Sequence, residues 1–240
     1  PESENKIGES LEKAANKEKS LGLTITKFAM LGNEHAIAFT NWIKNDLCPE
    51  TNMINYDIYK SMKGEEEDFR ILHDERYLDI FRMIDHSIID FKVDEEKPFS
   101  KTMIVRKKQD GSTFSRELSQ DSNGVHEFFA WAVQIFKVVY ENKIVFADEM
   151  DRVLNPILSD KVISYICGKK HFGQFIFTTH NVLHLDLKNY MKEQIYFITK
   201  DIETLESELY SLADFPEIRY ETTKIYEFYM KGILGGTSIE

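Results

Sequence analysis

Hydrophobic residues in the first part of the chain recur every three or four positions, the spacing of a helix with one buried stripe. This spacing predicts one helix over about 27–47 and a second over about 65–86. The acidic run 65–68 is expected to be a solvated helix start that complements the helix dipole. Before these helices, residues 1–20 are polar and predict a tail or linker, so that residues 21–90 form a mainly helical N-terminal segment.

The pattern changes to that of strands after the second helix, and then strands and helices alternate. Asp110-Gly111 is a strong signal for a hairpin turn between two of the strands. The predicted strands are 88–93, 102–107, 112–117, 143–147, 175–179, 195–199 and 208–212. The last two of these are expected to pair with each other. The predicted helices begin near 124, 155, 183 and 221, and the last of them stops at Gly232. The apolar strands 143–147 and 175–179 are expected to be covered on both faces, and the alternation predicts an α/β fold with a mostly parallel sheet.

Composition narrows the class of protein. The 240 residues are 42% hydrophobic, enough for a real core, and 41 acidic against 30 basic residues give a formal net charge of -11. This charge argues against a general electrostatic grip on nucleic acid. The longest uncharged apolar run, 128–136, is too short to span a membrane, and two cysteines without a C-x-x-C pair fit a reducing compartment. We expect a cytoplasmic protein with no membrane contact.

Three local patterns carry candidate chemistry. Ser122-Asn-Gly124 precedes a long helix and could present a hydroxyl and free N–H groups to a phosphate, although for this pattern alone an ordinary N-cap is the favoured explanation. Asp148-Glu149 follows an apolar strand, at the sheet edge where α/β proteins bind ligands. His180 follows the next strand, and a zinc site with His184 lacks a third ligand at metal spacing.

The order of these patterns resembles the C-terminal half of the ABC-type ATP-binding domain in bacterial AAA-like proteins of abortive-infection and other phage-defence systems. In that family a Ser-x-Gly-Thr signature, a Walker B strand ending in Asp-Glu-Ile-Asp with Leu-His-Pro after it, and a Thr-Thr-His switch follow one another. This chain has Ser122-Asn-Gly-Val, Asp148-Glu-Met-Asp with Leu154-Asn-Pro, and Thr178-Thr-His. Val125 and Asn155 depart from the family pattern. The resemblance implies that residues 91–240 form the C-terminal part of an ABC/RecA-like P-loop NTPase sheet.

The resemblance also implies roles for single residues. Asp148 would hold the shell of a Mg²⁺ ion, Glu149 would be the general base or would orient the attacking water, and His180 would contact the γ-phosphate of ATP.

The remaining implied sites act between two copies of the chain. Ser122 and Gly124 would contact ATP bound by the opposite protomer, and Asp151 would lie in the D-loop at the same interface. The implied assembly is a head-to-tail homodimer with ATP sandwiched between the protomers.

A phosphate-binding loop of the form G-x-x-x-x-G-K-[ST] is absent from the sequence. We expect this Walker A half to lie upstream of Pro1, the alternative being a naturally degenerate protein. The 240 residues by themselves are therefore predicted neither to bind ATP tightly nor to hydrolyse it.

Three functions remain open at this point. The leading hypothesis is an ATPase whose ATP-dependent dimerisation regulates an effector. The second is a non-hydrolysing scaffold whose acidic surface docks a basic protein such as a toxin. The third is the ATPase of a DNA-processing complex, supported only by the basic cluster Arg106-Lys107-Lys108, for which a solvated hairpin tip is the simpler explanation.

Overall fold

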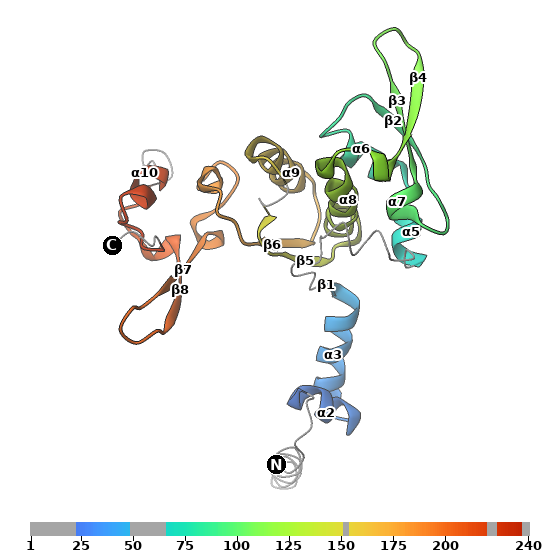
Figure 1. Cartoon of the computed structure of the whole chain (residues 1–240). Coiled ribbons are helices and arrows are strands. Elements are labelled where there is room, and N and C mark those ends of the chain that lie inside the picture. Colours follow the sequence, from blue (N-terminus) through green and yellow to red (C-terminus); the bar gives the residue numbers. More distant parts are fainter. Residues whose placement is uncertain (1–22, 49–65, 151–153, 220–224, 237–240) are drawn as a thin grey trace.

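The computed structural model describes residues 23–48, 66–150, 154–219 and 225–236. In these ranges the chain is mixed α/β with small sheets (Figure 1). The helices are α2 (Thr24–Met30), α3 (Glu34–Asp46), α5 (Glu66–Leu72), α6 (Glu75–Phe81), α7 (Pro98–Lys101), α8 (Asn123–Glu141), α9 (Pro156–Gly168) and α10 (Ile225–Met230). The strands are β1 (Leu47–Cys48), β2 (Ile88–Lys92), β3 (Met103–Lys107), β4 (Thr113–Glu117), β5 (Ile144–Ala147), β6 (Gln174–Phe177), β7 (Tyr196–Lys200) and β8 (Ser207–Ser211).

A parallel sheet of order β1-β5-β6 lies in the middle of the molecule (Figure 1). β5 and β6 pair in register from Ile144↔Gln174 to Ala147↔Phe177, so both strands end at the same edge. The prediction that these strands are covered on both faces is wrong for β6, because the side chain of Ile176 is 44% exposed. The predicted strand at 195–199 exists as β7 and pairs, as predicted, with the strand at 208–212, which is β8. The pairing is antiparallel, so β7 does not extend the parallel sheet.

The second sheet is antiparallel with order β2-β3-β4. Its β3–β4 hairpin is the one predicted from Asp110-Gly111, and Gly111 takes the positive φ of 84° that favours glycine at such a turn. The Asp-Gly turn signal was therefore sufficient to locate this hairpin.

Helix α8 is the centre of the main hydrophobic core. Its 19 residues extend over about 28 Å at 1.5 Å per residue, and most of its side chains are buried. Asn142, at a φ of 55°, ends the helix in the left-handed conformation, and β5 begins two residues later. The tight turn reverses the chain, so β5 runs back along α8. Trp131 of α8 then packs against Phe175 of β6, with their ring centroids 5.8 Å apart.

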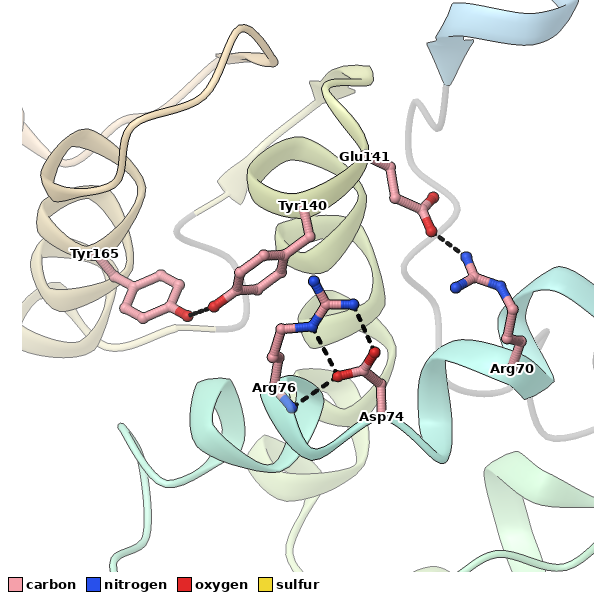
Figure 2. A network of polar contacts seen from close by, with 6 residues as sticks. All are labelled: Arg70, Asp74, Arg76, Tyr140, Glu141 and Tyr165. Atoms are coloured by element: carbon pink, nitrogen blue, oxygen red, sulfur yellow. Dashed lines mark hydrogen bonds and ion pairs between the residues drawn. The ribbon is translucent and has the colours of Figure 1, made fainter.

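A polar network holds three helices, α5, α6 and α9, around the C-terminal half of α8 (Figure 2). Asp74 caps α6 and forms a two-point ion pair with Arg76, whose guanidinium lies 4.6 Å from the ring centroid of Tyr140. The hydroxyl of Tyr140 lies 2.7 Å from that of Tyr165 on α9, and Arg70 of α5 pairs with Glu141.

Two of these groups have shifted pKa values. The hydrogen bond from Arg76 lowers the pKa of Asp74, whereas burial and the hydroxyl of Tyr140 raise the pKa of Tyr165. At neutral pH the carboxylate of Asp74 is thus charged and the hydroxyl of Tyr165 is protonated. Tyr140 of α8 contacts both Arg76 and Tyr165, and so links α8 to α6 and α9.

Each of the first two predicted helices is broken into two. Gly32, with a φ of 84°, ends α2, and the side chain of Asn33 then caps α3 by accepting from the N–H of Ala36. The predicted buried stripe is also wrong, because Phe39 and Trp42 are exposed. In the second case the N-cap at Asp74 starts a new helix, α6, after α5 has ended.

The predicted helix at 183–191 is absent, since this segment forms a short 3₁₀ turn at Val182–His184 followed by further turns. Leu185, Leu187 and Tyr190 pack instead against a second hydrophobic cluster, built around Phe197 of β7. Burial against this cluster overrides the helical spacing of the segment.

Candidate functional site

The candidate site starts at the acid turn, which we define as residues 148–150 at the end of β5. Asp148 and Glu149 are exposed, whereas the next residue, Met150, is fully buried. Glu149 has a φ of 50°, which a non-glycine residue adopts rarely and at a cost of about 1–2 kcal/mol. This left-handed residue lets the chain expose two carboxylates and bury the next side chain. Backbone strain of this kind is a feature of functional sites in proteins.

The neighbouring strand fastens the acid turn through Thr178, the first residue after β6. The hydroxyl of Thr178 donates to Oδ1 of Asp148 at 2.5 Å and accepts from the N–H of Glu149 at 2.9 Å. Its main-chain carbonyl accepts from the N–H of Met150 at 3.1 Å, and its N–H donates to the carbonyl of Ala147 at 3.0 Å. The predicted meeting of the two strand ends is therefore present in the structure.

His180 lies two residues beyond Thr178 and is exposed, in a segment shaped by its neighbours. Oγ1 of Thr179 accepts from the N–H of Asn181 at 2.9 Å, and Oδ1 of Asn181 accepts from the N–H of Leu183 at 3.1 Å. The β5–β6 pairing thus brings His180 to the edge that carries Asp148 and Glu149.

The alternative zinc pair is not formed. His184 is buried, and its Nε2 lies 3.0 Å from Oγ of Ser159 on α9. No group of three or more potential metal ligands exists among the described residues. His184 therefore has a structural role in the contact between α9 and the turn that follows β6.

The signature candidate lies at the start of α8. Ser122 is at the N-cap position, yet its hydroxyl makes no capping hydrogen bond, so the N-cap alternative accounts for its position but not for its side chain. Gly124 is exposed, and an added Cβ would meet no atom within 4 Å. Nothing in this part of the described fold requires a glycine at position 124.

Ser122 and Gly124 lie far from the acid turn, because α8 is longer than β5. The four residues of β5 span about 13 Å, whereas α8 extends over about 28 Å in the opposite direction. The start of α8 therefore projects roughly 15 Å past the end of β5. A role for Ser122 and Gly124 at this same acid turn is disfavoured, which agrees with the implied contact to a second protomer. Asp151, the implied D-loop residue, lies outside the described residues.

The predicted exposure of Arg106 is wrong. This residue belongs to the predicted basic cluster at the hairpin, but its side chain is only 10% exposed and forms two ion pairs. Its Nη1 lies 2.6 Å from Oδ2 of Asp121, the residue before Ser122, and its Nε lies 3.0 Å from Oδ2 of Asp85. Arg106 therefore ties β3 to the start of α8, and only Lys107 and Lys108 of the cluster are exposed.

The Asp85–Arg106 pair predicts a pH-dependent stability. Burial alone would raise the pKa of Asp85, but hydrogen bonds from Ser87 and Arg106 outweigh it and leave the pKa lowered. A lowered folded-state pKa stabilises the fold above the unfolded-state pKa, and this contribution is lost as the pH falls through the folded value. Asp85→Asn should therefore cost about 1–2 kcal/mol at pH 7 and much less near pH 3. Urea unfolding at both pH values measures this difference.

Glu95→Gln is the control for Asp85→Asn, because Glu95 is exposed and should change stability by less than about 0.5 kcal/mol at either pH. An Asp85→Asn cost that is the same at both pH values would contradict the assigned cause.

The chemistry available at the acid turn is that of oxygen ligands. The carboxylate of Asp148 is a hard donor suited to Mg²⁺, which commonly takes one or two protein carboxylates and completes its shell with water and phosphate oxygens. Glu149 is exposed beside Asp148 and could accept a proton from a water molecule. The residues present thus fit Mg²⁺ bound together with a phosphate.

Neither a protein-family model nor a curated protein matches the sequence. Among solved structures, this chain is similar to the Smc head domain with a coiled coil and joint from Pyrococcus yayanosii, with a TM-score of 0.42 and 16% sequence identity. The match covers 86% of this chain and 35% of that one, so this chain spans about a third of the matched chain's length. A score and an identity this low establish neither a shared fold nor a shared function.

No helix in the described ranges is long and apolar enough to cross a membrane.

Proposed function

We propose that this chain is the C-terminal part of an ABC-type ATPase head, which binds Mg²⁺ and ATP together with a phosphate-binding loop from outside these 240 residues. The observation that carries the proposal is the acid turn: two exposed carboxylates, one on a left-handed residue, fastened by hydrogen bonds to the strand that leads to His180. In this proposal Asp148 holds the Mg²⁺ shell, Glu149 orients the attacking water and His180 contacts the γ-phosphate.

The parallel sheet has an open face and an open edge, and both suit a further part of the protein. Parallel sheets are normally covered on both faces, yet Ile176 of β6 is 44% exposed, which suits an element packed on this face. Among the described strands, β6 also has no partner on the side away from β5. We propose that the strand carrying the phosphate-binding loop pairs with β6, beside Thr178 and His180.

Two features at the start of α8 support the proposal that ATP is bound between two copies of the chain. The hydroxyl of Ser122 is not used for capping, and Gly124 leaves open space that the described fold does not need. Both features suit close approach by a second protomer across bound ATP. From the sequence resemblance we propose that this ATP-dependent homodimer regulates a separate effector, as in phage defence.

Substitution of the two carboxylates in the natural polypeptide that contains these residues and a phosphate-binding loop tests the proposal. Glu149→Gln should lower the rate of phosphate release roughly a hundredfold or more, while ATP binding and dimerisation persist, because only the base is removed. Asp148→Ala should instead weaken the binding of Mg-ATP, measured by calorimetry. Asp110→Asn, an exposed acid at the hairpin tip, is the matched control and should behave like the wild type.

The dimer is tested separately by sedimentation with and without ATP. Ser122→Arg should block the ATP-dependent dimer and spare nucleotide binding to the monomer, whereas Gln120→Arg, two residues earlier and also exposed, should leave the dimer intact. Wild-type turnover by Glu149→Gln would overturn the proposed chemistry. ATP binding without any hydrolysis by the wild type would favour the scaffold alternative.

A further inference from the structure

We infer that Thr178 is the positioning residue of the acid turn: its hydroxyl sets the carboxylate of Asp148 and the main chain of Glu149 in one arrangement. What this arrangement is for rests on the proposed function, whereas the arrangement itself is tested independently of it. The sequence resemblance placed Thr178 in the Thr-Thr-His switch but implied no role for it by itself.

The hydroxyl of Thr178 donates one hydrogen bond and accepts another at the same time. It accepts from the N–H of Glu149 at 2.9 Å and donates to Oδ1 of Asp148 at 2.5 Å. A hydroxyl is the smallest side-chain group that can do both, whereas an aliphatic side chain of the same shape can do neither. The two bonds couple the direction of a side chain to the conformation of the following residue.

The main chain of Thr178 strengthens this coupling. Its N–H and carbonyl bind Ala147 and Met150, the residues on either side of the two carboxylates. The ends of the turn are therefore fixed by backbone bonds, and the hydroxyl alone fixes its middle. Because Thr is β-branched, few side-chain rotamers are available to it, and the hydroxyl is held in place before any ligand arrives.

The left-handed conformation of Glu149 explains why the middle of the acid turn needs a hydrogen bond from outside the turn. At a φ of 50° this residue is less stable than in an ordinary turn, and its N–H is directed at the Thr178 hydroxyl. Loss of that acceptor would free Glu149 to relax toward negative φ, which would swing its carboxylate away from the edge shared with His180. The carboxylate of Asp148 would lose its fixed direction in the same step.

Amide hydrogen exchange of the 240-residue chain, followed by NMR, reads the arrangement directly. Thr178→Val should raise the exchange rate of the Glu149 amide about tenfold, the effect of losing one hydrogen bond. The Met150 amide, bonded to the main-chain carbonyl of Thr178, should change less than about threefold and serves as the internal control. Thr178→Ser keeps the hydroxyl and should restore protection of Glu149.

Thr179→Val is the matched control variant, because Oγ1 of Thr179 accepts from the N–H of Asn181 instead. It should raise exchange at Asn181 and leave Glu149 unchanged. Equal exchange at Glu149 in wild type and Thr178→Val would overturn the inference. Equal acceleration of Glu149 and Met150 would do so too, since it would mean general loosening of the turn.

A second measurement separates the inference from the proposed function. In the natural polypeptide with its phosphate-binding loop, Thr178→Val should raise the Mg²⁺ concentration for half-maximal turnover about tenfold, and Thr178→Ser should stay within about threefold of wild type. If the exchange result holds and the wild type shows no Mg-dependent ATPase activity, the proposed function is wrong and the positioning role stands. If the wild type is active and Thr178→Val matches it in both measurements, the positioning role is wrong.

Discussion

Phe129→Ala should lower the free energy of unfolding by about 3–5 kcal/mol, the largest loss expected from a single substitution in this chain. Phe129 is fully buried on α8, and the rings of Tyr77, Phe81, Phe91 and Phe99 surround it at centroid distances of 5.4–5.8 Å. Three of these four contacts are close to perpendicular, the edge-to-face geometry that adds to burial. The substitution would leave a cavity where α6, α7, β2 and α8 meet.

Urea unfolding followed by circular dichroism measures the effect of Phe129→Ala, with an unchanged slope required for the comparison. Phe172→Ala is the control, because the side chain of Phe172 is 90% exposed and its loss should change stability by less than about 0.5 kcal/mol. A loss below about 1.5 kcal/mol for Phe129→Ala would show that the aromatic cluster can collapse around the cavity.

Gly173→Ala is expected to have the second largest effect, about 3 kcal/mol of destabilisation or more. A Cβ at this position would lie 2.1 Å from the carbonyl oxygen of Val138 and 2.9 Å from that of Lys143, and both are main-chain atoms that cannot rotate away. Gly173 directly precedes β6, whose first bond runs from the N–H of Gln174 to the carbonyl of Lys143. Relief of the clash would therefore move the start of β6 away from β5.

Because Gly173→Ala should move β6, it also tests whether a displacement of β6 reaches the acid turn. Thermal unfolding measures the loss, and exchange of the Met150 amide, bonded to Thr178, reports whether the displacement reaches the acid turn. Gly168→Ala is the matched control, since an added Cβ there meets no atom within 4 Å and alanine favours the helix end of α9. Equal stability of the two variants would contradict the close packing of Gly173.

The sequence alone located elements whose signals are local. The Asp110-Gly111 signal was enough to predict the β3–β4 hairpin, because a tight turn depends only on neighbours in sequence. The same holds for α9, where the Asn155 cap and Pro156 mark the first turn, and for the apolar strands that became β5 and β6. The prediction that Asp148 and His180 share one sheet edge followed from these two strands.

Other features were decided by contacts between segments distant in sequence. The helical spacing at 183–191 did not produce a helix. Burial of Leu185, Leu187 and Tyr190 against the cluster around Phe197 stabilises the fold more than a helix in this segment would. Arg106 reads as one of three exposed basic residues, and only the fold shows that Asp85 and Asp121 lie on either side of it. The role of Thr178 was hidden for the same reason, since a threonine at a strand end has no local signal for its partner.

The sequence by itself thus determined which residues could do chemistry, because carboxylates at strand ends and a histidine after the next strand follow from composition and period. Tertiary structure decided how they are held. The left-handed φ of Glu149, its hydrogen bond to Thr178 across 29 residues of chain and the two ion pairs of Arg106 all depend on which segments become neighbours. That choice is made by burial of apolar surface around α8, a property of the whole core that no local window of sequence contains.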